Sequence, residues 1–266
     1  MNAKLKSLTL IKVIILIAFS SLSFIAKSDA NPELWPYIQE RMFKDKDITT
    51  ADFIRISGPK RASSGAQVPI NIQLAAKEGI EIKQIFLIID GNPVQLAATY
   101  QLTEATQSID LSTRIRMETD SFVRVVGEST DGKLYMNQVA IRASGGCSGY
   151  MDSTDPAHTA DLGKILLKST KDRYVTTRIK HPNFTGLMKD SINGWFVPEW
   201  YVKDVVFSYN GKKILNVKGG ISISQDPYIK FNFKGKKSGK LTVSATDTKG
   251  ETFSLEKIVF KVNALI

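Results

Sequence analysis

The feature that most constrains this chain is a strict alternation of apolar and polar residues in several short stretches. From Val68 to Leu74 every second residue is apolar, and from Tyr228 to Phe233 the aliphatic and Phe side chains again fall on alternate positions. Successive side chains of a β-strand point to opposite faces of a sheet, so each stretch predicts a strand with one buried face. Between residues 52 and 143 no stretch has a convincing helical period. The chain is therefore expected to be all-β.

Further strand candidates are separated by sequences that favour turns. Asp131-Gly132 and Asn210-Gly211 are typical of β-hairpin turns, and residues 90–93 and 247–250 are rich in turn-forming side chains. A single short helix is expected from Pro32 to Phe43, where apolar residues follow a helical stripe. The other expected strands cover residues 80–89, 109–117, 122–126, 134–141, 174–179, 201–209, 212–217, 241–245 and 252–262.

The alternation stops between residues 144 and 163 and then resumes. This segment begins with small residues from Ser144 to Gly149 and continues with few apolar side chains, a composition typical of a linker. We therefore expect two immunoglobulin-like β-sandwich domains, at 31–143 and 164–266, joined by a glycine-rich linker.

The N-terminus has the three parts of a secretory signal peptide. Lysines precede an apolar run from Val13 to Phe24, and small residues follow at Ser28 and Ala30. The run is short for a membrane span, so residues 1–30 are expected to be a signal peptide. An uncleaved N-terminal anchor is the alternative. No other segment approaches the length of a membrane span, and the mature chain is expected to be soluble and exported.

The net charge is uneven along the chain. The sequence has 36 Lys+Arg and 26 Asp+Glu, a net charge of +10. Residues 1–30 contribute +3 and residues 31–150 contribute −1, so residues 151–266 carry +8. A nucleic acid partner is not expected for an exported chain. The lysines of the second half form either a solvated strand edge or a docking surface for acidic partners or anionic cargo. They are Lys212, Lys213, Lys230, Lys234, Lys236, Lys237 and Lys240.

The single cysteine, Cys147, lies in an unusual setting. One cysteine cannot form an internal disulfide, and one Cys with two His falls short of the four ligands of a structural zinc site. Cys147 is flanked by Gly145 and Gly146 on one side and by Ser148 and Gly149 on the other. Because glycine is conformationally permissive and slim, this pattern predicts a thiol on a mobile arm. A free or dimer-forming thiol is the alternative.

A catalytic role for Cys147 within this chain is disfavoured. A nucleophilic thiol needs a base held close to it. His158 lies in the linker and His181 in the second domain, and neither spacing forms a motif. Phosphate-binding loops, paired carboxylate motifs and metal-ligand clusters are not recognisable in the sequence, so a carried thiol fits better than an enzyme.

Motifs in both halves resemble one known family in a consistent order. The chain resembles a fusion of SoxY and SoxZ, the two subunits of the carrier complex of sulfur oxidation. The segment 145–149 is close to the Gly-Gly-Cys-Gly-Gly arm of SoxY, and residues 181–186, His-Pro-Asn-Phe-Thr-Gly, are close to the His-Pro-Met-Glu-Thr-Gly motif of SoxZ. Matching motifs also lie at 68–70, 92–93, 113–117, 131–135, Pro198, 209–211, 226–228, 238–239 and 248–250.

The resemblance implies a periplasmic carrier that is not an enzyme and binds no cofactor. In the family, the arm cysteine holds sulfur intermediates covalently and presents them to separate enzymes. These include a haem-containing sulfur transferase and a sulfate-releasing hydrolase. By resemblance, Cys147 is the attachment residue, Gly145, Gly146 and Gly149 make the arm flexible, and the two halves pair closely. The His-Pro motif shared with the family favours a turn or interface role for His181 over a chemical one. The sequence departs from the family in two ways: Ser148 replaces a glycine, and the arm continues into a second domain.

Fused proteins of this kind also resemble carriers encoded beside quinoprotein dehydrogenases. This resemblance leaves a second function open. The chain is then a β-sandwich adaptor for a periplasmic quinoprotein dehydrogenase, with Cys147 incidental or dimer-forming.

Overall fold

The computed structural model describes residues 30–170, 173–235 and 238–260. The predicted signal peptide therefore lies outside the described residues except for Ala30, as do Lys236 and Lys237 of the lysine set. Within the described ranges, no helix is long and apolar enough to cross a membrane.

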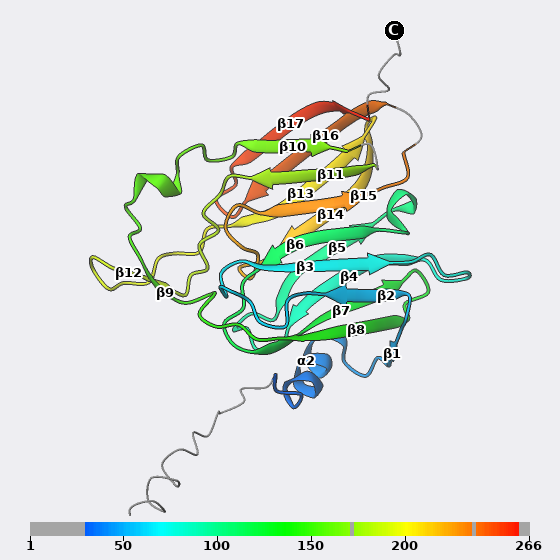
Figure 1. The fold of residues 1–266 in the computed structure, drawn as a ribbon, viewed down its shortest axis with the longest axis horizontal. Coiled ribbons are helices and arrows are strands. Elements are labelled where there is room, and N and C mark those ends of the chain that lie inside the picture. The colour runs from blue at the N-terminus through cyan, green and yellow to red at the C-terminus, as the bar shows by residue number, and fades with distance from the viewer. Residues whose placement is uncertain (1–29, 171–172, 236–237, 261–266) are drawn as a thin grey trace, which may run out of the picture.

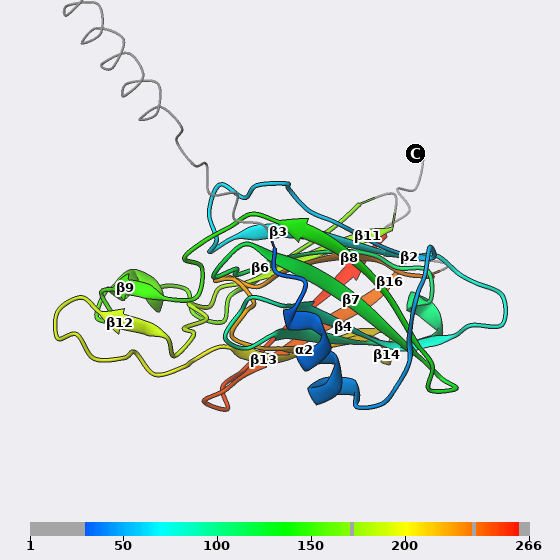
Figure 2. The ribbon, with the colours of Figure 1, turned by 90° about the horizontal axis from the view of Figure 1, so that it is seen from below.

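The described residues fold into two large stacked β-sheets and one small separate sheet (Figures 1 and 2). The nine-stranded sheet has the order β1 (Ile48–Thr50), β8 (Leu134–Ile141), β7 (Ser121–Ser129), β4 (Ile82–Ile89), β5 (Leu96–Leu102), β14 (Lys212–Gly219), β13 (Val202–Tyr209), β16 (Gly239–Asp247) and β17 (Thr252–Val259). The six-stranded sheet has the order β10 (Ile165–Ser169), β11 (Tyr174–Ile179), β15 (Tyr228–Asn232), β6 (Asp110–Ile115), β3 (Val68–Leu74) and β2 (Ile54–Ser57). The small sheet pairs β9 (Gly149–Met151) with β12 (Met188–Asp190).

The alternating stretches form strands with one buried face, as the sequence predicts. In β3 the residues Val68, Ile70, Ile72 and Leu74 are buried, while the side chains between them are exposed or half-buried. The all-β fold class is therefore confirmed. Two short 3₁₀ helices, η1 (Glu104–Thr106) and η2 (Pro156–His158), lie in connections.

The predicted N-terminal helix is present as α2 (Leu34–Phe43). Ile38 and Phe43 pack against Ile88 and Leu134 on the outer face of the nine-stranded sheet. The helix thus covers one end of this sheet (Figure 2) and lies apart from the main core.

The two halves of the chain join edge to edge, so both large sheets run through both halves. In the nine-stranded sheet β5 pairs with β14, where Leu102 faces Leu215. In the six-stranded sheet β6 pairs with β15, where Leu111 faces Phe231. The close pairing of the halves that the resemblance implies is present as two backbone ladders.

One apolar core fills the space between the two large sheets and continues across the junction. Phe207 on β13 and Phe231 on β15 contact each other across the sheets, with ring centroids 4.9 Å apart. Buried residues of this single cluster come from both halves and include Ile70, Leu87, Val125, Val175, Phe207, Leu215, Phe231 and Val243.

The segment 144–163, which the sequence predicts to be a glycine-rich linker, contains short regular elements and makes hydrogen bonds to the rest of the chain. Strand β9 pairs in parallel with β12 of the second half. The carboxylate of Asp190 accepts hydrogen bonds from the backbone N–H groups of Ser153, Ile192 and Asn193. We call residues 149–163 and 187–199 the β9–β12 lobe. In both views it projects from one end of the sandwich (Figures 1 and 2).

The shared core predicts that the two halves unfold together. Phe231→Ala removes a buried ring at the junction and is expected to lower the free energy of unfolding by about 3–5 kcal/mol in a single transition. Urea unfolding followed by circular dichroism and by tryptophan fluorescence measures this. The exposed Phe196 is the matched control, and Phe196→Ala should shift stability by less than about 0.5 kcal/mol. Two separate transitions, with one insensitive to Phe231→Ala, would contradict the shared core.

Candidate functional site around Cys147

Cys147 lies in the interior of the protein rather than on an exposed arm. Its exposed fraction is 0%. The chain leaves β8 and runs back along the segment that follows β6. The N–H of Gly145 donates to the carbonyl of Glu118 at 2.9 Å, and the N–H of Gly146 donates to the carbonyl of Met117 at 3.0 Å. The expectation of a solvent-exposed, mobile tether is therefore wrong for this structure, because the backbone just before Cys147 is hydrogen-bonded to the segment that follows β6.

The glycines around Cys147 shape a tight path instead of a loose one. A Cβ added to Gly146 would lie 2.2 Å from the carbonyl oxygen of Gly65, so this position requires glycine for close packing. Gly145 and Gly149 have φ values of +65° and +123°, which favour glycine in turns. The predicted flexibility role is thus replaced by a packing role at Gly146 and a turn role at the other two.

The second half covers Cys147 from the other side. The hydroxyl of Thr185 donates to the carbonyl oxygen of Cys147 at 2.7 Å. Thr185 and Asn183 are both buried, and Asn183 has a positive φ of 47°. Its side-chain amide donates to the carbonyl oxygens of Ile223 and Ser224. Residues 181–186 therefore form a segment, here called the lid, that is hydrogen-bonded to the backbone of Cys147.

His181 holds this lid in place and does not contact the thiol. Its Nδ1 accepts a hydrogen bond from the N–H of Asn183 at 3.1 Å, and its Nε2 lies 3.4 Å from Asp247 Oδ2. Trp200 donates to the same carboxylate at 2.6 Å. Burial lowers the pKa of His181, which favours the neutral ring. The turn role favoured from the sequence agrees with this geometry.

His158 lies near the lid without reaching Cys147. Its Nε2 is 3.0 Å from the carbonyl oxygen of Asp152, and its ring packs edge-on against Phe184 at 5.3 Å between centroids. Neither histidine is hydrogen-bonded to Cys147 among the described contacts. Among all the residues that the structure describes, no group of three or more His, Cys, Asp and Glu residues could hold a metal ion.

Comparisons with known families identify the two halves. Residues 39–147 match the family of sulfur oxidation protein SoxY, and the match ends at the cysteine. Residues 168–257 match the family of sulphur oxidation protein SoxZ. The chain is a fused SoxY–SoxZ-like protein. It is therefore a carrier of the sulfur-oxidation system and not an enzyme.

Solved structures show similarity at low sequence identity. The sulfur carrier protein SoxY from Chlorobium limicola f thiosulfatophilum is 21% identical with a TM-score of 0.36, over 42% of this chain and 92% of that chain. Fibronectin(III)-like modules of Clostridium thermocellum CbhA are 12% identical with a TM-score of 0.23, over 77% of this chain and 92% of that chain. A search of curated proteins gave no match.

Glu118 of the SoxY-like half clamps the residues around the thiol, although the sequence reasoning did not single it out. Its Oε2 accepts hydrogen bonds from the N–H of Cys147 at 2.8 Å and the N–H of Ser148 at 3.1 Å. Its Oε1 accepts one from the Ser148 hydroxyl. Burial acts to raise the pKa of Glu118, but these hydrogen bonds outweigh it and lower the pKa below its ordinary value. The carboxylate is thus held ionised.

The thiol itself is held in its protonated form. Burial, followed by the negative charge of Glu118, raises the pKa of Cys147 to about 12, while Arg116 acts in the opposite direction. The thiolate is the nucleophilic form of cysteine. In this conformation the SoxY-like half therefore stores an unreactive thiol.

The lysines proposed for docking lie away from Cys147. The backbone N–H of Arg116, next to the site, donates to the carbonyl of Ser222, shortly after β14 ends at Gly219. Lys212 begins β14, and a seven-residue strand segment spans roughly 23 Å at about 3.3 Å per residue. Lys234 lies at the same far end, where its N–H donates to the carbonyl of Ala105. Docking of partners through these lysines stays a prediction. The lysines take no direct part in forming the surroundings of the thiol.

Other members of the lysine set are already engaged. Lys230 Nζ lies 4.6 Å from the centroid of the Tyr174 ring. Lys240 forms an exposed ion pair with Glu256 at 3.1 Å. These contacts agree with the solvated-edge interpretation for the two residues.

Exposed apolar side chains gather instead on the β9–β12 lobe, whose first strand begins two residues after Cys147. Their exposed fractions are 61–77%, and among the other described residues only Tyr37 is a large apolar side chain of comparable exposure. Sequence patterns do not reveal them, because isolated aromatic residues in loops have no periodic signal. They are Tyr150, Ile192, Trp195 and Phe196.

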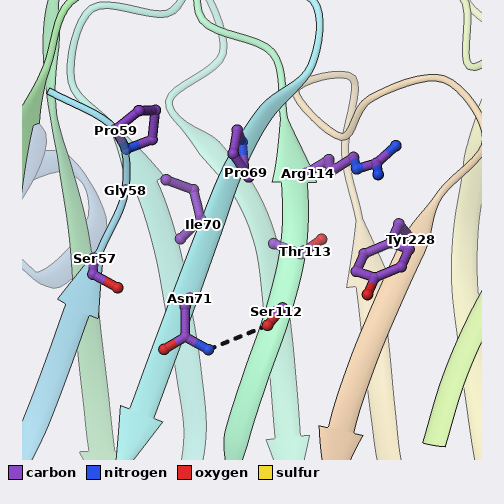
Figure 3. Close-up of a pocket in the computed structure, with 10 residues that line it drawn as sticks. All are labelled: Ser57, Gly58, Pro59, Pro69, Ile70, Asn71, Ser112, Thr113, Arg114 and Tyr228. Carbon is purple, nitrogen blue, oxygen red and sulfur yellow. Dashed lines mark hydrogen bonds between the residues drawn. The ribbon is translucent and has the colours of Figure 1, made fainter. Parts of the chain in front are cut away.

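A groove on the outer face of the six-stranded sheet crosses the same junction (Figure 3). The guanidinium of Arg114 on β6 lies 5.0 Å from the ring centroid of Tyr228 on β15. Asn71 donates to the Ser112 hydroxyl at 3.2 Å on its floor. Cys147 does not line this groove, so it is separate from the candidate site.

The burial of Cys147 predicts slow reaction with thiol reagents. With Ellman's reagent at pH 8, the native chain should react more than about 100-fold slower than the unfolded chain. Thr185→Val removes a buried hydrogen bond to the Cys147 carbonyl and should speed the native reaction by up to about tenfold. Thr49→Val, on the exposed strand β1, should leave the rate unchanged. Equal rates for native and unfolded chains would show that Cys147 is exposed in solution.

The Glu118 clamp predicts a specific pH dependence. Because its folded-state pKa is lowered, its contribution is present above the ordinary value of 4.5 and is lost as the pH falls through the folded-state pKa. Glu118→Gln should lower the free energy of unfolding by about 1–3 kcal/mol at pH 7. This difference should shrink as the pH falls below 4.5. Urea unfolding measures it, with the exposed Glu78→Gln as control. An undiminished difference at acidic pH would refute the clamp.

Proposed function

We propose that Cys147 carries sulfur intermediates as covalent adducts and presents them to partner enzymes of periplasmic sulfur oxidation. The observation that carries this proposal is the SoxY family match, which ends at the only cysteine of the chain. The residue also lies where the SoxY-like and SoxZ-like halves meet, between Glu118 and Thr185. The predicted signal peptide at 1–30 supports the periplasmic location.

The carrier role requires that the buried thiol emerges when a partner binds. Residues 147 and 148 are held to the lid and to the Glu118 side chain by four hydrogen bonds: one from Thr185 and three accepted by Glu118. Hydrogen bonds contribute about 0.5–1.5 kcal/mol each, and somewhat more when charged. The summed free energy of these hydrogen bonds is small compared with that of the strand ladders and the apolar core that join the halves. We therefore place the opening in the lid and the β9–β12 lobe.

The partners we propose are a haem-containing sulfur transferase, a sulfate-releasing hydrolase or a quinoprotein dehydrogenase. The exposed apolar side chains of the β9–β12 lobe, among them Trp195 and Phe196, support contact near Cys147. Aromatic side chains of this kind are enriched in protein interfaces. The distant lysines, Lys212, Lys213 and Lys234, are a second proposed contact, for acidic partners.

One observation favours the adaptor alternative. A buried cysteine with a raised pKa is also what a purely structural thiol looks like. In an adaptor for a quinoprotein dehydrogenase, Cys147 would then stay unmodified while the β9–β12 lobe binds the enzyme.

Intact-mass spectrometry separates the two functions. The protein should be purified without reductant from its native compartment, during growth on reduced sulfur compounds. The carrier predicts mass increases that match added sulfur atoms or a thiosulfonate, located on Cys147 and removed by dithiothreitol. Cys147→Ser should carry none, whereas Ser148→Ala should still be loaded. Only free thiol, or a dimer through Cys147, would exclude the carrier and leave the adaptor.

A further inference from the structure

Arg116 is a buried arginine with no acidic partner among the described residues. Its exposed fraction is 4%. One guanidinium nitrogen, Nη1, donates to the carbonyl of Gly146 at 3.1 Å, and Nη2 donates to the carbonyl of Asn183 at 3.2 Å. The third nitrogen, Nε, is buried without a hydrogen-bond partner. The charge of this side chain is therefore only partly solvated by the protein.

Arg124, the other buried arginine of the SoxY-like half, has an acidic partner that compensates its charge. Arg124 is also 4% exposed. Its Nε donates to both carboxylate oxygens of Asp90 at 3.0 and 2.8 Å, and its Nη2 lies 2.8 Å from the same group. Removing a charge from water is costly unless an opposite charge compensates it. The contrast indicates that Arg116 lacks a negatively charged partner.

Cys147 is the group placed to supply that partner. Arg116 bonds the carbonyl of Gly146, the residue directly before Cys147, and the two side chains influence each other electrostatically. The resting thiol is uncharged, and the charge of Glu118 is engaged by Cys147 and Ser148. With an unmodified thiol, the described contacts therefore give Arg116 no negatively charged partner.

We infer that Arg116 is the binding residue for an anionic sulfur adduct on Cys147, with a sulfonate-type end group as the ligand class. This inference rests on the proposed carrier function. A sulfonate keeps its negative charge at all physiological pH values and offers three acceptor oxygens. A guanidinium presents several donors in a planar fork that suits oxyanions. A neutral cargo of similar size leaves Arg116 uncompensated.

The site needs both halves of the chain. The two carbonyls that orient Arg116 belong to Gly146 in the SoxY-like half and to Asn183 in the SoxZ-like half. The SoxZ-like half therefore has a direct role beyond pairing: it helps to aim the guanidinium toward the cargo.

The test compares an anionic and a neutral adduct made chemically on Cys147. Tetrathionate is attacked by the thiolate at a central sulfur. An Sγ–S bond forms, the central S–S bond breaks, and thiosulfate leaves with the electron pair, so the product ends in –S–SO₃⁻. Methyl methanethiosulfonate reacts in the same manner, losing methanesulfinate, and leaves a neutral –S–CH₃ group. Both reactions are run on the unfolded full chain, which is then refolded and checked by intact mass.

The expected result is a difference in melting temperature, measured by scanning calorimetry. In the wild type the anionic adduct should melt at least about 2–4 °C above the neutral adduct. In Arg116→Gln this difference should vanish or reverse. Arg114→Gln, which removes the neighbouring arginine in the outer groove, should keep the full difference. If Arg116→Gln does not refold, Arg116→Lys should retain the charge but lose the fork, and should show a smaller difference.

Two outcomes overturn the inference. One is equal melting temperatures of the two adducts in the wild type. The other is a wild-type difference that persists in Arg116→Gln or is abolished by Arg114→Gln. Because the adducts are installed chemically, neither outcome depends on whether cells load Cys147. Failure of the carrier function appears only in the native mass spectrum, so the two failures are distinguishable.

Discussion

The backbone ladders between β5 and β14 and between β6 and β15 hold the SoxY-like and SoxZ-like halves in one register. They turn two small sandwiches into one with a continuous core. Everything at the candidate site depends on that register. Strand β6 ends beside the start of β15, so Arg116 and Glu118 of the first half meet Asn183 and Thr185 of the second around Cys147.

The structure has a stable framework of paired strands and a more weakly held cover over the Cys147 segment. The framework consists of paired strands and large buried side chains such as Phe207 and Phe231. The cover consists of a few hydrogen bonds to a short segment and a small sheet that projects from the sandwich. Under the proposed carrier function, release of the thiol from this internal arm therefore requires opening of the cover and no unfolding of the core.

The sequence predicted the strands that have one buried face, because alternation is a local property. It predicted β3 and β11 with the bounds that the structure shows. It missed β5, where the four residues from Ala97 to Tyr100 are all buried. Because successive side chains of a strand point to opposite faces, both faces of β5 are covered here, and no alternation marks the strand. The sequence pattern therefore gave no sign of β5, the strand of the first half that pairs with β14.

The sequence by itself determined the all-β class, the motifs of SoxY and SoxZ, and the identity of the single thiol. The tertiary structure decided where that thiol lies and what surrounds it. Along β6 the residues Ser112 and Arg114 face outward, and the same parity assigns Arg116 to the exposed face. Instead Arg116 is buried, because segments that are distant in sequence, before Cys147 and around Asn183, fold over the end of the strand. Alternation sets the face of a side chain within a strand, but only long-range packing decides whether that face meets water.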